Sequence, residues 1–130
     1  MATYEHLDLG PRPFTAKPGH VWRLAAGPGR SVTFEEAVQL AEQAAAASDM
    51  GVLSAKEMEF GWVLVLQSRQ YIATRSFSDQ LVGHGITIVD GRTGDVYWSG
   101  SATPPWDAIV GFLAARPPTP PQSGYERSGR

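Results

Sequence analysis

The sequence predicts one α+β domain, an antiparallel sheet of about four to five strands with two helices packed on one of its faces. Strand-like segments follow one another through residues 61–100, and amphipathic helical segments stand before and after them. Consecutive strands with helices at the ends indicate this class, whereas strict alternation would indicate a parallel sheet. The chain of 130 residues is long enough to bury a core of its own.

Composition divides the chain into three parts. Residues 1–19, where prolines and glycines recur, are predicted to be an extended N-terminal arm. Residues 20–116 form the α+β domain, and residues 117–130 are predicted to be a disordered, proline-rich tail. Residues 21–24 are a candidate short strand with Trp22 and Leu24 on one face.

The first helix has a clear start. Thr33 and Glu36 have the spacing of a capping box, in which each side chain bonds to the backbone N–H of the other residue. Phe34 and a series of alanines then recur at helical spacing, and residues 49–51 are predicted to end the helix. Residues 52–59 fit either an edge strand or a loop.

The strand pattern is clearest after residue 60. Trp62, Leu64 and Leu66 alternate with Val63 and Val65, and a run that is apolar on both sides predicts a central strand. A tight turn at residues 67–70 and a returning strand at 71–74 are expected to follow. Residues 75–81 then form a loop or a short helical turn.

The last strands and the second helix complete the pattern. Residues 86–89 and 95–99 are predicted to be strands joined by a hairpin loop at residues 90–94. Thr103 can cap the second helix, with Pro104 at its first position, where a missing N–H costs nothing. Its apolar stripe consists of Trp106, Ile109, Val110 and Leu113.

Few residues have the spacing that catalysis or metal binding requires. The histidines, His6, His20 and His84, each lack a second ligand at metal-binding spacing in their own segment. Ser68 and the serines at residues 99–101 lack a nucleophile motif, and the glycine-rich loop at residues 27–31 lacks the lysine of a phosphate loop. We therefore expect no enzyme activity, no metal and no cofactor.

Charge and composition restrict the partners and the compartment. The net charge is -2 without a basic block, which argues against nucleic acid. The chain has no signal-peptide pattern and no membrane-length apolar run, and its lack of cysteine is compatible with a reducing cytoplasm. Acidic residues in the first half cap and solvate the helix, or form a surface that attracts a basic protein.

Aromatic residues suggest a protein-binding surface. Tyr97 and Trp98 are adjacent in one strand, so one of them is expected on the sheet face that the helices leave open. Tyr71 and Phe77 can extend this surface. The predicted partner-binding residues are Tyr71, Phe77, Asp79, Tyr97 and Trp98. The alternative is that these aromatic residues pack beneath the N-terminal arm.

A series of short motifs follows the alanine-rich helix in a fixed order. They are Gly61-Trp62, Tyr71 after a polar turn, a glycine-flanked loop at residues 83–85, Val89-Asp90, Thr93-Gly94-Asp95-Val96, and Gly100 followed by Thr103-Pro104. In this order they resemble the YrhB-type, immunity protein 35 family of bacterial polymorphic toxin systems, over residues 32–115. The chain departs from the family at His84 and Ile86, where an asparagine and a proline are common.

The resemblance implies a small cytoplasmic α+β protein that neutralises a toxin by binding it, and it implies no catalytic residues. The leading hypothesis is an immunity-type protein with a toxin domain as its partner and no contact with nucleic acid or membrane. A small general chaperone that binds many clients is the second hypothesis. A small-molecule binding domain or a hydrolase is the third. The oligomeric state stays open.

Overall fold

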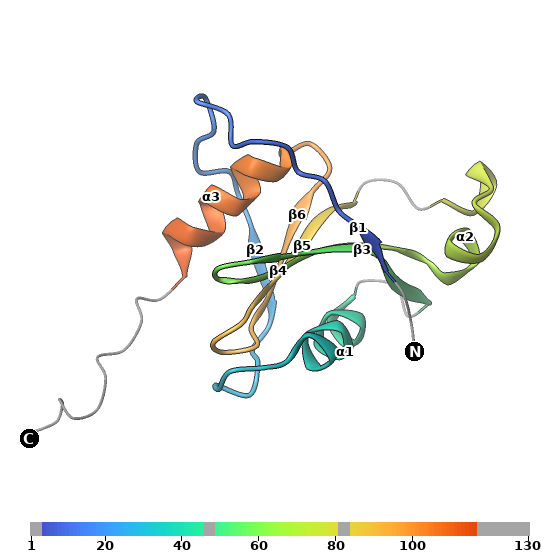
Figure 1. The fold of residues 1–130 in the computed structure, drawn as a ribbon, viewed down its shortest axis with the longest axis horizontal. Coiled ribbons are helices and arrows are strands. Elements are labelled where there is room, and N and C mark those ends of the chain that lie inside the picture. The colour runs from blue at the N-terminus through green and yellow to red at the C-terminus, as the bar shows by residue number, and fades with distance from the viewer. Residues whose placement is uncertain (1–3, 46–48, 81–83, 117–130) are drawn as a thin grey trace, which may run out of the picture.

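The α+β class is confirmed by the computed structural model, which describes residues 4–45, 49–80 and 84–116, with only the backbone of residue 84. Within these residues a six-stranded sheet has the order β1-β3-β4-β5-β6-β2 (Figure 1). The elements are β1 (Glu5–His6), β2 (Trp22–Ala25), α1 (Phe34–Ala44), β3 (Met50–Met58), β4 (Gly61–Ser68), α2 (Arg69–Thr74), the 3-10 turn η1 (Phe77–Asp79), β5 (His84–Asp90), β6 (Val96–Gly100) and α3 (Pro105–Ala115).

The sheet is wider than the sequence predicts because strands are added at both edges. Strands β2 to β6 pair antiparallel, whereas β1 runs parallel to β3 and makes the sheet mixed. The predicted strand at residues 21–24 is confirmed as β2 (Trp22–Ala25), one residue later, and it forms the edge beyond β6. Residues 50–58, which the pattern left open, form a nine-residue strand.

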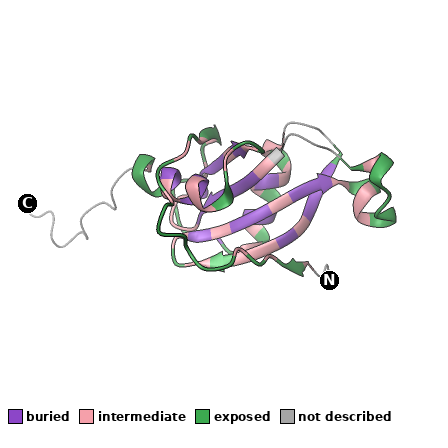
Figure 2. Ribbon diagram, turned by 90° about the horizontal axis from the view of Figure 1, so that it is seen from above, coloured by how far each residue is buried: buried purple, intermediate pink, exposed green. Residues whose placement is uncertain are grey.

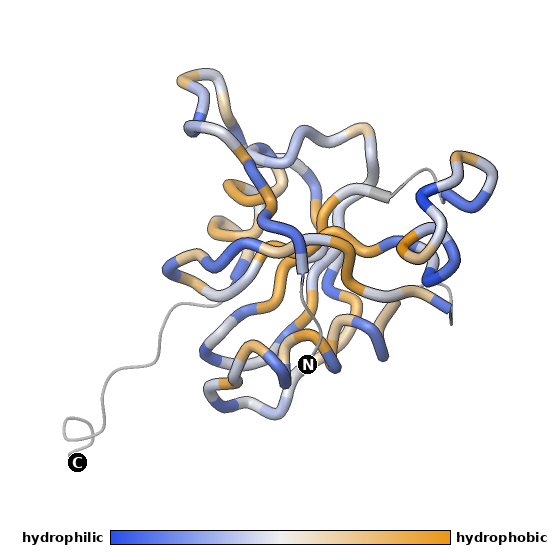
Figure 3. The backbone as a smooth tube through the Cα atoms, turned by 45° about the vertical axis from the view of Figure 1, so that its right-hand side comes forward, coloured by the Kyte–Doolittle hydropathy of each residue, from blue (hydrophilic) through white to orange (hydrophobic). Residues whose placement is uncertain are grey.

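The two long helices cover opposite faces of the sheet, so the prediction that both pack on one face is wrong. Leu64 packs in a cluster with residues of α1, and its neighbour Val63 packs in a second cluster with residues of α3. Figure 1 shows the two helices on either side of the strands, and Figure 2 shows the strands largely buried between them. Figure 3 shows the apolar segments crossing the middle of the molecule. Because β4 is apolar on both sides, each side requires a helix to exclude water.

The start of α1 is confirmed. The Glu36 backbone N–H donates to Thr33 Oγ1 at 3.2 Å, and the Thr33 N–H donates to Glu36 Oε1 at 3.0 Å. The helix ends at Ala44, earlier than predicted, and Met50 already belongs to β3. Its buried positions include Ala37 and Ala41, whose small side chains let the helix lie close to the sheet.

The returning strand predicted at residues 71–74 is wrong, because this segment belongs to helix α2. Ser68 Oγ accepts the backbone N–H of Tyr71 at 3.0 Å, which caps the helix as β4 ends. The residues that follow include good helix formers, so a capped helix forms where a tight turn was expected. The helical turn predicted within residues 75–81 is confirmed as η1.

Helix α3 begins one residue later than predicted, with Pro104 as N-cap and no capping bond from a side chain. Its buried stripe is also rotated from the predicted one. Gly111 and Phe112 face the protein, and Leu113 is 42% exposed. Gly111 allows this rotation, because without a Cβ the helix can approach the backbone of Gly19 in the arm.

The segment that precedes β2 packs against the rest of the chain. Leu7 and Leu9 contact the apolar cluster beneath α3. Trp106 Nε1 of α3 donates to the carbonyl oxygens of Leu9 and Gly10 at 3.0 and 3.2 Å. The arm therefore completes the cover of this sheet face. The predicted tail, residues 117–130, lies outside the described residues.

We predict that the Gly111→Ala substitution lowers the free energy of unfolding by about 1–3 kcal/mol, the usual cost of overpacking. A Cβ at Gly111 would collide with the Gly19 carbonyl oxygen, and alanine's higher helix propensity offsets only part of that cost. Urea unfolding measures the difference. Gly100→Ala is the control, because a Cβ there has open space, and equal stability of the two variants would contradict this packing.

We also predict that Glu36 makes a contribution to stability that is lost in acid. Hydrogen bonds from Arg30 and from the Thr33 backbone lower the pKa of Glu36 from its ordinary 4.5 to about 2. This depressed pKa adds stability above pH 4.5 that is lost as the pH falls from 4.5 to about 2. The Tm should therefore fall more steeply in this range for the native chain than for Glu36→Gln. The control is Glu35→Gln, whose Tm should fall as steeply as that of the native chain. Parallel Tm curves for the native chain and Glu36→Gln would rule out this contribution of Glu36.

Candidate functional site

A largely exposed segment projects from the end of β4, and we call it the finger (residues 69–80). It comprises α2 and η1 and stands off one end of the sheet (Figure 1). Its surface is largely exposed, in contrast to the strands from which it starts (Figure 2). The finger therefore offers side chains to a partner without competing with the packing of the core.

Hydrogen bonds across the base of the finger hold α2 and η1 together. Ser68 Oγ donates to the Asp79 carbonyl oxygen at 2.6 Å while it accepts the Tyr71 N–H. Thr74 Oγ1 donates to Asp79 Oδ2, also at 2.6 Å. Asp79 thus joins both ends of the segment, and it acts as a positioning residue within the finger.

Arg75 lies between α2 and η1 in the left-handed conformation, with a φ of 57°. For a residue with a side chain this conformation costs roughly 1–2 kcal/mol, so other contacts must stabilise it. The Arg75 N–H donates to the Tyr71 carbonyl oxygen at 2.7 Å, and the guanidinium pairs with Glu5 of β1. The sharp change of direction at Arg75 leads directly into η1.

Phe77 is the apolar residue that this frame presents. Its side chain is 88% exposed within η1. An exposed phenylalanine in a segment held by internal hydrogen bonds is a preformed anchor, since little conformational entropy is lost when a partner covers it. The structure therefore brings together three predicted contact residues, Tyr71, Phe77 and Asp79, and makes Phe77 the most accessible of them.

Tyr97 does not belong to an exposed surface, and its prediction as a contact residue is corrected. It is buried beneath α3, with its ring centroid 5.0 Å from that of Phe112 in an edge-to-face arrangement. Burial raises the pKa of the Tyr97 hydroxyl, and the carboxylate of Asp95 adds to this shift. The prediction assumed that one sheet face is open, whereas α3 covers the face on which Tyr97 lies.

Trp98 belongs to a second surface, which we call the tryptophan edge (Trp22, Leu24 and Trp98). The centroids of the Trp22 and Trp98 rings lie 5.1 Å apart across the β2–β6 pair. The sequence placed Trp22 and Leu24 on one face of a strand, but their position at the edge depended on long-range pairing. A small pocket with a cavity volume of about 80 Å³ adjoins this edge and is lined by Leu24, Ala41, Ala45, Met50, Leu66, Gly85, Thr87 and Trp98.

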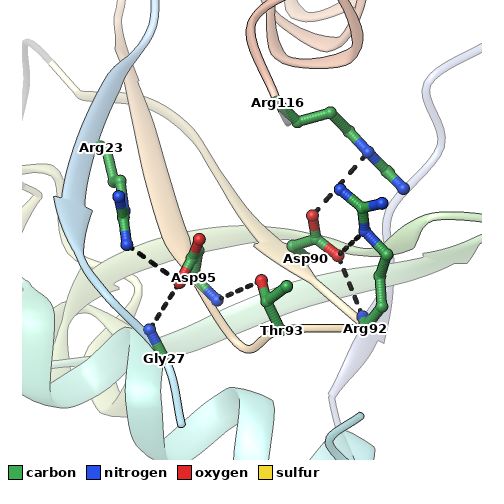
Figure 4. Close-up of polar contacts among 7 residues, drawn as sticks. All are labelled: Arg23, Gly27, Asp90, Arg92, Thr93, Asp95 and Arg116. Atoms are coloured by element: carbon green, nitrogen blue, oxygen red, sulfur yellow. Dashed lines mark hydrogen bonds and ion pairs between the residues drawn. The ribbon is translucent and has the colours of Figure 1, made fainter. Parts of the chain in front are cut away.

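Two buried carboxylates beside the β5–β6 hairpin, Asp90 and Asp95, stabilise the fold (Figure 4). Asp90 lies near the Nε atoms of Arg92 and Arg116, at 3.6 and 3.8 Å, which ties the hairpin to the end of α3. Asp95 Oδ1 accepts the Gly27 N–H at 2.7 Å and lies 3.4 Å from Arg23. These contacts anchor α3 and β2 to the hairpin, which the sequence had marked only as a turn.

Within residues 4–45, 49–80 and 84–116, no group of three or more His, Cys, Asp or Glu side chains is placed to hold a metal ion. No helix in the described part of the chain has the length and apolar character needed to cross a bilayer.

We predict that Asp79→Ala loosens the finger while leaving the sheet intact. Amide exchange in residues 69–80 should become about fivefold faster, because the Thr74 hydroxyl loses an acceptor worth about 1 kcal/mol. Hydrogen exchange with mass spectrometry measures this rate. Ser78→Ala is the control, since it removes only the hydroxyl contact with Ser76. Unchanged exchange in Asp79→Ala would show that Asp79 does not position the finger.

Comparisons with protein-family models, with curated proteins and with solved structures found no match to this chain.

Proposed function

We propose that this protein is an immunity-type protein that binds one partner protein through the finger and neutralises it by stoichiometric contact. One observation carries the proposal, the 88% exposure of Phe77 on a segment braced by hydrogen bonds. Water-exposed phenylalanine is unfavourable in isolation, and burial of such a side chain contributes about 1.5–3 kcal/mol. A cleft or pocket on another protein provides that burial.

Bracing makes the finger suited to a specific partner. Association is weakened when loops and side chains must be ordered on binding, and the bonds at Ser68, Thr74 and Asp79 order this segment beforehand. Arg69 and Arg75 flank the anchor with positive charge, although each also contacts a carboxylate of the chain. An aromatic anchor with charged residues at its margin is the usual composition of an interface centre and its rim.

The finer parts of the proposal rest on the resemblance of residues 32–115 to immunity proteins. On that basis the partner is a toxin domain, the encounter takes place in the bacterial cytoplasm, and the chain acts without catalysis. Exposed carboxylates, among them Glu35, Glu57 and Glu59, support a role in attracting a basic toxin. Neutralisation then follows from occupancy of the toxin's active site or of a surface that the toxin needs.

The pocket beside the tryptophan edge favours a second candidate function, the binding of a small apolar molecule. Its lining is almost entirely apolar, and its volume of about 80 Å³ has room only for a molecule much smaller than the ligands of ordinary binding pockets. A reproducible rise in Tm with one compound from a metabolite screen, abolished by Leu66→Phe, would favour this function. General chaperone activity is the remaining alternative, and suppression of aggregation of unrelated proteins would reveal it.

We predict that Phe77→Ala weakens binding of the partner roughly tenfold to a hundredfold, the loss expected for one buried aromatic anchor. The partner is first identified by capture from native lysate with the tagged chain, followed by mass spectrometry. A single protein at near-equal stoichiometry is expected. Its affinity for each variant is then measured by calorimetry, and rescue of cells that express it tests neutralisation.

Phe14→Ala is the matched control, because Phe14 is a fully exposed phenylalanine in the arm, outside the finger. Its affinity should equal that of the native chain. Equal losses in the two variants would mean that the finger has no special role. Undiminished binding by Phe77→Ala would overturn the proposed site, and many weak clients without a dominant partner would overturn the proposed function.

A further inference from the structure

We propose that β2 is a self-association edge, through which two copies of this chain pair their β2 strands antiparallel around a twofold axis. Strand β2 has a single neighbour among the described residues, β6, so its outer backbone edge is available for another strand. Exposed strand edges pair readily with further strands, and short length, a bulge, charge, proline or a covering segment opposes this pairing. This inference goes beyond the proposed function and does not depend on it.

The two edges of the sheet differ in their exposed side chains. At one edge, β1 has only two residues, Glu5 and His6, and Glu5 forms an ion pair with Arg75. At the other edge, β2 has four residues and exposed apolar side chains, with Trp22 46% and Leu24 39% exposed. Each edge strand therefore carries an ion-paired charged residue, and β2 is the one whose apolar side chains gain free energy when they are covered.

The side chains of β2 are self-complementary. Alternation along β2 places Trp22 and Leu24 on the side on which Trp98 lines the pocket, and a β-bulge between Arg23 and Ala25 leaves Leu24 without a partner residue on β6. A twofold axis at Arg23 would place Trp22 of each copy opposite Leu24 of the other. Directly opposed residues in an antiparallel pair lie about 4.5–5.5 Å apart, so these apolar side chains would contact one another.

Arg23 does not oppose this pairing. It projects to the other sheet side, where its guanidinium lies 3.4 Å from Asp95 Oδ1. The twofold axis thus brings two ion pairs together instead of two unpaired cations, and like charges directly opposite one another are the usual reason why such pairs fail. A second copy supplies a strand of the same length and places its Leu24 and Trp22 opposite this copy's Trp22 and Leu24, which makes it the occupant that this edge fits.

The arrangement leaves the finger accessible. The finger follows β4 and contacts β3 and β4, whereas β5 and β6 separate β4 from β2. A dimer through β2 would form one continuous sheet with a finger in each copy, each free to bind a partner. The isologous contact closes after two copies and does not extend into a fibre. Because the strand is short, the dimer is expected to dissociate in the micromolar range.

The test is sedimentation velocity on the purified full chain, without a partner, from low to high micromolar concentration. The expected result is a shift from the 14.0 kDa monomer to a species of twice that mass. Leu24→Asp should abolish the shift. Leu113→Asp should preserve it, and this is a matched control, because Leu113 is 42% exposed on α3 and Leu24 is 39% exposed on β2. Circular dichroism verifies that the variants fold.

Several results would overturn the proposal. They are a native chain that stays monomeric at every concentration, a dimer that persists in Leu24→Asp, a dimer lost only in Leu113→Asp, and association that grows without limit. If Leu24→Asp does not fold, Trp22→Ala replaces it, and the same loss of the dimer is required. These measurements use no partner, so a failure here leaves the function proposed for the finger unaffected.

Discussion

The burial of both faces of the central strands is the constraint on which the rest of this structure depends. Val63 and Leu64 of β4, like Ile88 and Val89 of β5, are adjacent residues that point to opposite sides, and all four are almost completely buried. Each face must therefore be covered separately. Helix α1 covers one face, and α3 with the N-terminal arm covers the other. The centre of the sheet is thereby removed from any role in recognition.

The covers are held in place by specific contacts at one end of the sheet. The buried carboxylates of Asp90 and Asp95 connect the β5–β6 hairpin to α3 and to the segment that carries β2. Groups of this kind are costly to bury without partners, so the hairpin, the helix end and the edge strand are positioned together. The exposed apolar side chains of the finger and of the tryptophan edge take no part in these polar contacts.

Local signals in the sequence predicted the local structure well. The capping box at Thr33, the alternation through β4 and the hairpin loop at residues 90–94 each depend on residues close together in the chain, and each is confirmed. The cover of each face could not be predicted in the same way. It depends on which strands pair and on how closely a helix can approach, and the contact of Gly111 with Gly19 joins residues that are distant in sequence.

The candidate site was likewise predictable in its local features but not in those that depend on long-range packing. The aromatic residues were recognised from the sequence, but Tyr97 and Trp98 could be assigned to faces only in relative terms, and the presence of α3 decided that Tyr97 is buried. Phe77 was predicted only as an extension of the aromatic surface at Tyr97 and Trp98. Its exposure follows from the Ser68 cap, which replaced the expected return strand with a helix. The place of Trp22 and Leu24 at the edge of the sheet depends on the pairing of β2 with β6, which local sequence patterns do not predict.

We propose that recognition takes place at the finger, because helices already cover both sheet faces. Hydrogen exchange of the chain alone and in complex with its captured partner tests this most directly. Protection on binding is expected to be concentrated in residues 69–80, while the amides of α1 and α3 exchange as in the free chain. Protection confined to α1 or α3, with unchanged exchange in the finger, would contradict recognition at the finger.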